Sequence, residues 1–164
     1  MPQEDLQLLP LLLYQEIEVL EHLKQHPHPN LIRYLGAVVN RDRIRGIALE
    51  KHDMMLANRF KTSTCNIDTA VCIEGLQAGI KHLHSLGFAH KDLHPGNIAL
   101  DDHDRPVILD FGSCKEFGQQ LISAGTPGWA DEYYTSEAQH DEDAIGKIKM
   151  WLEEKSKALG SGSF

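Results

Sequence analysis

The sequence predicts an α+β fold in which one helix and about two strands precede a mainly helical part. Apolar residues recur at helical spacing in three windows of the chain. Short apolar runs bounded by turn residues lie between these windows and are typical of strands. The chain has 164 residues, of which 41% are hydrophobic, enough for one folded domain with its own core.

The first helix is expected over residues 11–24 and must end near Pro27. Two strands are expected next, over 31–39 and 44–50, and together they predict a small sheet. Residues 51–66 show no clear pattern and are expected to form a connection and a polar loop. The apolar positions that define the first helix are Leu13, Ile17, Leu20 and Leu23.

A long helix is expected over residues 68–86, with Asp68 as its N-cap and Gly87 at its stop position. Two short strands, 98–100 and 107–109, then predict a hairpin around a polar turn. The glycine-rich stretch after it, 112–129, is expected to be a loop. The apolar face of the long helix is Ile73, Leu76, Ile80 and Leu83.

The last helix is expected over residues 141–157, followed by a flexible tail rich in glycine and serine. Its apolar face is Ile145, Ile148, Trp151 and Leu152. No internal repeat is visible, so the elements are expected to build a single domain.

The segment His90–Asn97 and the triplet Asp110-Phe111-Gly112 hold the strongest chemical signal in the chain. Phosphoryl transfer needs a carboxylate that orients the attacking hydroxyl and oxygen ligands for magnesium ions. Asp92 is suited to the first role, and Asn97 and Asp110 to the second. The expected hairpin brings Asn97 and Asp110 to the same end of a two-stranded ribbon. An unrelated hairpin with solvated turn carboxylates is the alternative.

The composition argues against several other classes of function. The net charge of −8 and the scattered basic residues predict no nucleic-acid partner. The N-terminal apolar run, 8–13, is too short to span a membrane and lacks the features of a signal peptide, so we expect no membrane partner and a cytoplasmic or nuclear location. The cysteines Cys65, Cys72 and Cys114 and the clustered histidines His22, His26, His28, His82 and His84 predict neither a disulfide framework nor a zinc site.

From about residue 14 to residue 154, the order of these elements and motifs resembles that of the eukaryotic protein kinase family, serine/threonine type. The stretch Gly125–Glu132 is similar to the end of that family's activation segment, with Ala130-Asp131-Glu132 in place of Ala-Pro-Glu. Asp141–Gly146 resembles the opening of the helix that anchors the catalytic loop. The resemblance implies ATP and Mg²⁺ as cofactors and a protein substrate.

The resemblance also implies roles for particular residues. It makes Asp92, His94, Asn97 and Thr126 catalytic, and Asn97 and Asp110 the metal ligands. It implies that Asp141 holds the backbone of His90 and Lys91. It places four residues in a buried regulatory stack: Leu20, Tyr34, His90 and Phe111.

For the nucleotide, the resemblance implies five binding residues. Glu16 stands where the family keeps a helix glutamate that pairs with a strand lysine. Glu50, Lys51 and His52 fall at the hinge, where backbone groups contact adenine. Ala99 is assigned to the same nucleotide site.

Several positions depart from the family's pattern. Lys91 replaces an arginine, and a lysine cannot make the planar bidentate contact of a guanidinium. His94 stands where the family usually has a lysine. The first glycine is Gly36 and the first lysine is Lys24, so nothing ahead of Glu16 can be a glycine-rich lid or the strand lysine.

These departures predict a single incomplete domain over 1–164 that is truncated at both ends. A partial N-lobe would occupy 1–50 and a partial C-lobe 51–164. Three functions stay open: a serine/threonine protein kinase, a pseudokinase or interaction module, and a small-molecule kinase of the aminoglycoside or choline type. Self-association through the truncated faces is a further expectation.

Overall fold

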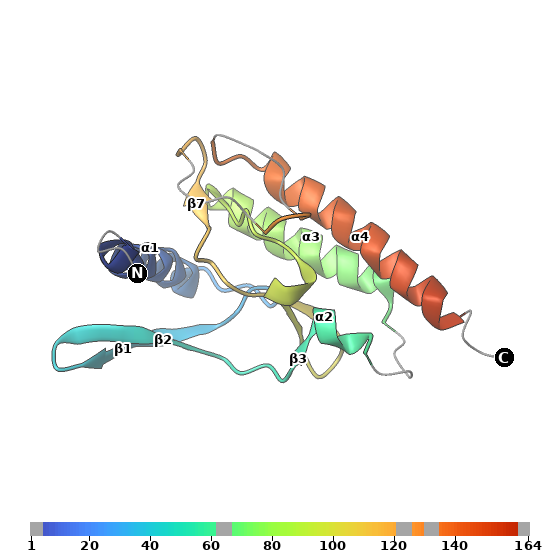
Figure 1. The fold of residues 1–164 in the computed structure, drawn as a ribbon, viewed down its shortest axis with the longest axis horizontal. Helices are drawn as coiled ribbons and strands as arrows, with labels where there is room; N and C mark the ends of the chain where they lie inside the picture. The colour runs from blue at the N-terminus through green and yellow to red at the C-terminus, as the bar shows by residue number, and fades with distance from the viewer. Residues whose placement is uncertain (1–4, 62–66, 121–125, 130–134, 161–164) are drawn as a thin grey trace.

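The computed structural model describes residues 5–61, 67–120, 126–129 and 135–160 and has the expected mixture of helices and strands (Figure 1). Predictions for Cys65, Gly125, the triplet Ala130-Asp131-Glu132 and the residues after Gly160 lie outside these ranges. The elements in chain order are α1 (Asp5–Gln25), β1 (Tyr34–Asn40), β2 (Arg43–Leu49), β3 (Met54–Met55), α2 (Leu56–Arg59), α3 (Thr69–Ser85), β4 (Phe88–Ala89), a 3₁₀ turn (Pro95–Asn97), β5 (Ile98–Leu100), β6 (Pro106–Ile108), β7 (Lys115–Glu116) and α4 (Gln139–Gly160).

Helix α1 begins earlier than the sequence predicted, at Asp5 instead of residue 11, and it contains Pro10. A proline inside a helix removes one backbone hydrogen bond but does not always end the helix. The predicted end is confirmed, because α1 stops at Gln25 just before Pro27. The core-facing side of α1 is formed by Ile17, Val19, Leu20 and Leu23.

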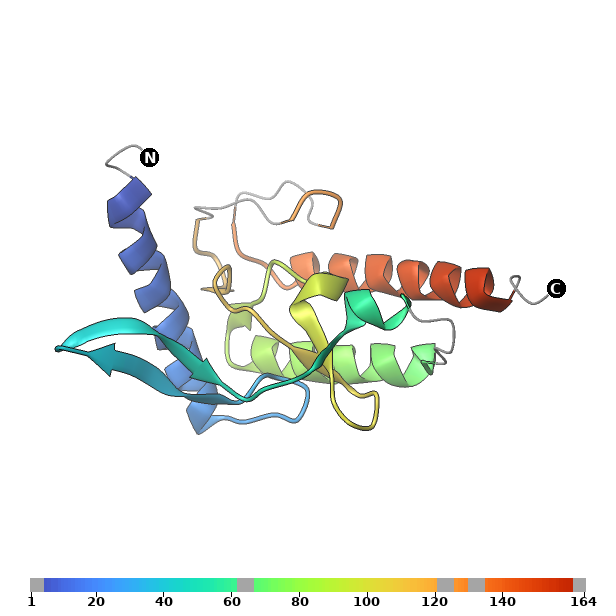
Figure 2. The ribbon, with the colours of Figure 1, turned by 60° about the horizontal axis from the view of Figure 1, so that its bottom comes forward.

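Strands β1 and β2 form an antiparallel hairpin that projects from the rest of the molecule beside α1 (Figures 1 and 2). The turn residues Arg41 and Asp42 both have positive φ, 51° and 58°, which gives a hairpin turn whose twist matches that of the strands. Strand β1 starts three residues later than predicted, since Leu31 and Ile32 pair with Ile108 of β6.

The predicted hairpin in the second half is confirmed as β5 and β6, with the second strand one residue earlier than expected. Strand β3 adds to β5, so this sheet has the order β3-β5-β6. Strands β4 and β7 pair with each other in a second small sheet. The predicted connection 51–60 and loop 112–129 also contain the short elements β3, α2 and β7, which the sequence did not predict because two to four residues are too few to show a periodicity.

Helices α3 and α4 run side by side along the other end of the molecule (Figures 1 and 2). Asp68 caps α3 as predicted, since its carboxylate accepts hydrogen bonds from the amides of Ala70 and Val71 at 2.9 and 3.2 Å. Gly87 follows the helix with φ 87°, the left-handed conformation typical of a residue just after a helix end. The predicted inner faces are buried at Ile73, Leu76, Ile80, Leu83, Ile145, Ile148 and Leu152.

Candidate active site

The backbone before Asp92 is held by Asp141, which lies in the first turn of α4 and is 0% exposed. Its Oδ2 accepts a hydrogen bond from the amide of His90, and its Oδ1 accepts one from the amide of Lys91, both at 2.8 Å. The predicted role of Asp141 is therefore confirmed. The structure adds His84 of α3, whose Nε2 lies 2.8 Å from Oδ2. A histidine in the last turn of a helix gave no sequence signal for this contact.

The ring of His90 joins the same loop to the end of β6. Its Nδ1 accepts a hydrogen bond from the amide of Asp92 at 3.3 Å, and its Nε2 is 2.8 Å from the carbonyl of Leu109. Both contacts are satisfied by the neutral ring with its proton on Nε2. The ring also packs edge-on against Phe111 at 5.1 Å between centroids. Leu20 and Tyr34, the other members of the predicted stack, are buried as well.

Lys91 is a buried lysine in left-handed backbone, with φ 69°. Its amino group donates a hydrogen bond to the carbonyl of Ser113 at 3.3 Å. Burial is the main reason why the pKa of Lys91 is lowered from its usual value, with repulsion from Lys115 second. This lysine therefore fastens the loop to the segment after Gly112, a contact that the sequence did not predict.

The carboxylate of Asp92 is held in one orientation by two neighbours. Its Oδ1 accepts hydrogen bonds from the hydroxyl and the amide of Thr126 at 2.6 and 2.8 Å. The side-chain amide of Asn97 donates to Oδ2 at 3.2 Å and to the Asp92 carbonyl at 3.0 Å. Asp92 is half-buried.

His94 lies beside this carboxylate. Its Nε2 is 3.9 Å from Oδ2 of Asp92, and its Nδ1 accepts a hydrogen bond from the amide of Gly96 at 3.1 Å. A side chain at Gly96 would place its Cβ 2.8 Å from Cε1 of His94. The ring can lie here because position 96 is glycine.

Asn97 and Asp110 meet at one end of the β5–β6 ribbon, as the sequence predicted. The amide of Leu109 donates to the carbonyl of Asn97 at 2.9 Å, which sets the two positions side by side. The Asn97 amide nitrogen donates to Asp92, and its side-chain oxygen is an acceptor of the type that cations bind. Asp110 has φ 60°, and its exposed carboxylate accepts one bond at Oδ1, from Gly112 at 3.2 Å.

The chemistry of these two side chains fits magnesium. Oxygen donors are what Mg²⁺ prefers, and it usually takes only one or two carboxylates from the protein and fills its octahedron with water and phosphate. In the described ranges, no group of three or more histidine, cysteine, aspartate or glutamate side chains could hold a metal ion. Asn97 and Asp110 supply oxygen donors of the kind that a magnesium ion shared with a phosphate would use.

Glu16 points from α1 toward the same end of the ribbon. Burial raises the pKa of its carboxyl group, the charge of Asp110 raises it further, and the amide of Phe111 acts in the opposite direction. Among the described residues, no cation contributes to this shift. The glutamate lies next to the proposed metal ligands, and none of the described lysines forms an ion pair with it.

The four other nucleotide residues lie on the connection and on β5. Glu50, Lys51 and His52 directly follow β2, and Lys51 pairs with Asp53. Ala99 is buried within β5. Within the described residues, no hydrogen bond or ion pair joins these four to Asp92, and their nucleotide roles stay predictions.

Comparison with known proteins identifies the class to which this fold and site belong. The family model "Protein kinase domain" matches residues 5–151. The serine/threonine-protein kinase Tao of Drosophila melanogaster is 31% identical over 82% of this chain, and Serine/threonine-protein kinase 1 of Arabidopsis thaliana is 30% identical over 84%. The chain belongs to the protein kinase domain family.

A solved structure shares the fold. The crystal structure of the yeast RNA Pol II CTD kinase CTDK-1 complex matches with a TM-score of 0.72 and 19% identity, over 83% of this chain and 48% of that one. The match confirms the predicted protein kinase-like fold. The chain spans only 13% of the length of Tao and 17% of the length of the Arabidopsis kinase.

The membrane prediction can be compared with the helices. Within the described ranges, none of them combines the length and the apolar character that crossing a bilayer requires.

Proposed function

We propose that this chain carries the base- and magnesium-binding half of a kinase site that transfers phosphate from ATP to serine or threonine of protein substrates. The observation that carries the proposal is the carboxylate of Asp92, fixed on one oxygen by Thr126 and on the other by Asn97. Membership of the protein kinase domain family supports phosphoryl transfer, and the serine/threonine kinases among the relatives support the acceptor.

In this proposal, Asp92 accepts a hydrogen bond from the substrate hydroxyl and orients its oxygen for attack. Thr126 and Asn97 keep the carboxylate from rotating, so little reorganisation is needed when the substrate arrives. Its Oδ2 lies 3.9 Å from Nε2 of His94, so the imidazole ring borders the place of the reacting hydroxyl. Magnesium bound with ATP would neutralise the phosphate charge.

The nucleotide would lie between the two parts of the domain. We assign residues 1–50 to the N-lobe part and 51–164 to the C-lobe part, because the connection after β2 separates the hairpin from β3. Asn97 and Asp110 would hold the magnesium ion. Glu50, Lys51 and His52 would contact adenine from the connection, with Ala99 below them. Glu16 would bind no phosphate directly and would require a cationic partner.

The base assignment is tested by substituting Asp92→Asn and measuring transfer of labelled phosphate from ATP to a mixed protein substrate. General-base assistance contributes about 10²–10⁴-fold, so the variant should lose at least about 10²-fold in rate. Asp102→Asn is a matched control, because Asp102 is an exposed carboxylate of the β5–β6 turn. Full activity in Asp92→Asn, or an equal loss in the control, would contradict the role of Asp92.

A pseudokinase that binds partners without turnover is the second candidate. The observation that favours it is the surroundings of Glu16. The carboxyl group of Glu16 lies beside that of Asp110, and among the described residues no cation contributes to its pKa shift. Thermal-shift measurements with ATP and magnesium separate the two candidates when they are paired with the transfer assay. Nucleotide binding that Asp110→Asn weakens, without any transfer, would favour the pseudokinase.

A small-molecule kinase is the third candidate, since such enzymes often share the His-x-Asp-x-His-x-x-Asn pattern. Thr126 supports a protein substrate, because the stretch that contains it resembles the end of an activation segment and Thr126 donates two hydrogen bonds to Asp92. Phosphate appearing on choline or an aminoglycoside, and never on protein, would reverse this order.

A further inference from the structure

An open pocket of about 560 Å³ lies between the end of α1 and the start of β1. Its apolar lining comes from both elements and from the loop between them, and it includes Leu23, Leu31 and Leu35. Two cations, Lys24 and Arg33, lie at the same pocket. Among the residues that line the pocket, Glu50 also belongs to the proposed nucleotide site.

The pocket is lined by two cations, Lys24 and Arg33, and by one acid, Glu50, so its balance of charge favours an anion. The C-terminal end of a helix carries partial negative charge, which would repel one. In α1 that end is offset by Lys24 in its last turn and by His26, whose Nδ1 lies 3.1 Å from the carbonyl of His22. The Lys24 amino group also lies 5.5 Å above the centre of the Tyr34 ring.

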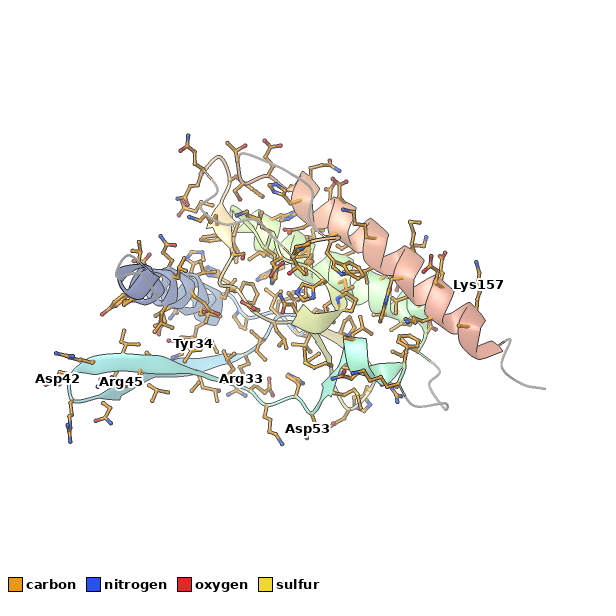
Figure 3. All side chains as sticks on the ribbon, in the orientation of Figure 1. Arg33, Tyr34, Asp42, Arg45, Asp53 and Lys157 are labelled. Carbon is orange, nitrogen blue, oxygen red and sulfur yellow. The ribbon has the colours of Figure 1, made fainter. Side chains whose placement is uncertain are left out.

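The β1–β2 hairpin continues from this pocket as a basic surface with exposed apolar side chains. Between residues 33 and 45 the sequence has four arginines and a single acid, Asp42, although the whole chain has a net charge of −8. Figure 3 shows Arg33 at the base of the hairpin and Arg45 and Asp42 toward its tip. In the described residues none of these arginines forms an ion pair: Arg33, Arg41, Arg43 and Arg45.

The hairpin also offers backbone groups for pairing, apart from the Leu35 carbonyl, which accepts a hydrogen bond from the Lys24 amino group at 3.5 Å. In the part of the chain that the structure describes, β1 and β2 pair only with each other. A strand at the edge of a sheet presents amide and carbonyl groups to which another extended chain can bind. Strand β1 has seven residues, so it spans roughly 23 Å at about 3.3 Å per residue. Leu35, Val38 and Val39 are exposed along it, at 51%, 46% and 59%.

We propose that the pocket and β1 together form a docking surface for an extended acidic peptide of another protein. An apolar side chain at one end of the peptide enters the pocket. Its backbone then runs along β1, and its glutamates or aspartates face the arginines of the hairpin. Charge complementarity selects this occupant, since four unpaired guanidinium groups favour carboxylates and disfavour a second cationic strand.

The proposal does not depend on phosphoryl transfer, so it is tested without nucleotide. The probe is a fluorescent peptide that begins with leucine and then alternates glutamate with valine. Its binding to the full chain is followed by fluorescence anisotropy at low ionic strength and near 1 M salt. We expect saturable binding that weakens strongly with salt, because the Debye length falls from about 30 Å at 0.01 M to about 3 Å at 1 M. A peptide with lysine in place of glutamate should not bind.

Charge-reversal variants locate the site. The double variant Arg43→Glu and Arg45→Glu should weaken binding by about tenfold or more at low salt, because each exposed ion pair contributes up to about fivefold. Lys157→Glu is the matched control, since Lys157 is an exposed cation at the far end of α4 (Figure 3). An equal loss in the control would show non-specific attraction and overturn the proposal.

The pocket is tested separately with Leu35→Ser and with a peptide whose leucine is replaced by alanine. Each change should weaken binding by several-fold, and the two together should weaken it little more than either alone, because they remove the same contact. Strictly additive losses would place the leucine elsewhere. Hydrogen exchange should show that the peptide protects amides of β1, and protection confined to α4 would overturn the proposal.

A second copy of this chain is the competing occupant. Sedimentation at increasing concentration would show association that Arg43→Glu and Arg45→Glu abolish. If such association occurs and the peptide fails to compete with it, the surface belongs to a dimer and the peptide proposal is wrong.

Discussion

The loop around Asp92 and the β1–β2 hairpin treat their charged residues in opposite ways. In the loop, Asp141 is fully buried and each of its oxygens accepts hydrogen bonds, while Lys91 is buried against a carbonyl. In the hairpin, the arginines project into solvent and form no ion pair among the described residues. A buried charge must be fully paired because desolvation is costly, whereas an exposed charge stays available for a partner. The first region is built to hold a geometry, and the second is suited to binding.

The largest expected effect comes from removing the anchor of the loop. Asp141→Ala leaves the amides of His90 and Lys91 without their acceptor in a buried place. Each such group costs about 1–3 kcal/mol, so the free energy of unfolding should fall by about 3–5 kcal/mol. Urea unfolding of the variant and the parent protein measures this loss of unfolding free energy. Glu142→Ala, the exposed neighbour in the same helical turn, should change stability by less than about 0.5 kcal/mol.

Shortening a buried apolar side chain should cost more stability than shortening an exposed one in the hairpin. Leu83→Ala removes a side chain that is 0% exposed on α3 and should cost about 2–5 kcal/mol. Val38→Ala in the hairpin, at 46% exposure, should cost less than about 1 kcal/mol. Thermal unfolding of both variants measures the difference. Similar losses at the two sites would mean that the hairpin is packed in solution, and the contrast between the regions would fail.

Alanine in place of glycine tests how closely atoms pack around a position in α3 and around one in the hairpin. A Cβ at Gly75 of α3 would lie 2.7 Å from Cγ of Pro106, which is part of β6. Gly75→Ala should therefore destabilise by about 1–2 kcal/mol, in spite of the better helix propensity of alanine. Around Gly46 of β2 no atom lies within 4 Å of the added carbon, and φ is not positive there. Gly46→Ala should be neutral or slightly stabilising, and a destabilised Gly46→Ala protein would reveal a hidden contact of the hairpin.

The smallest expected effect is a pH dependence at the junction between the two regions. His28 precedes Asn30, whose amide donates to its Nδ1 at 3.2 Å. Burial, followed by repulsion from His82, lowers the pKa of His28 below its usual 6.5. The unfolded chain then binds a proton more readily than the folded one, so stability is lost as pH falls below about 6.5 and through the folded pKa.

His28→Asn keeps an acceptor for the Asn30 amide but cannot be protonated in this range. Melting temperatures between about pH 8 and pH 5 should decline less steeply in this variant than in the parent protein. His103→Asn, on the exposed turn of the β5–β6 hairpin, is the control and should follow the parent. An identical decline in all three proteins would exclude His28 as the cause.

Much of the fold could be predicted because its signals are local. The long apolar faces, the Asp68 cap and Gly87 fix α3 almost to the residue. Strands β3, β4 and β7 could not be predicted, since each has two residues and exists only because a distant strand lies beside it. Leu31 could not be placed from the sequence for the same reason. It lies in a strand-like stretch, yet it pairs with Ile108 of β6 and does not extend β1.

For the candidate site, the sequence predicted Asp92, Asn97 and Asp110 as the residues that carry the chemistry, and the resemblance added Thr126 and Asp141. Their spacing is a property of the chain and needs no structure. The tertiary structure decided which oxygen each partner contacts, that His84 shares the carboxylate of Asp141, and that Glu16 faces Asp110. It also decided that the hairpin arginines form no ion pair within the part of the chain that the structure describes. These outcomes depend on contacts between residues far apart in the chain, and no local propensity encodes them.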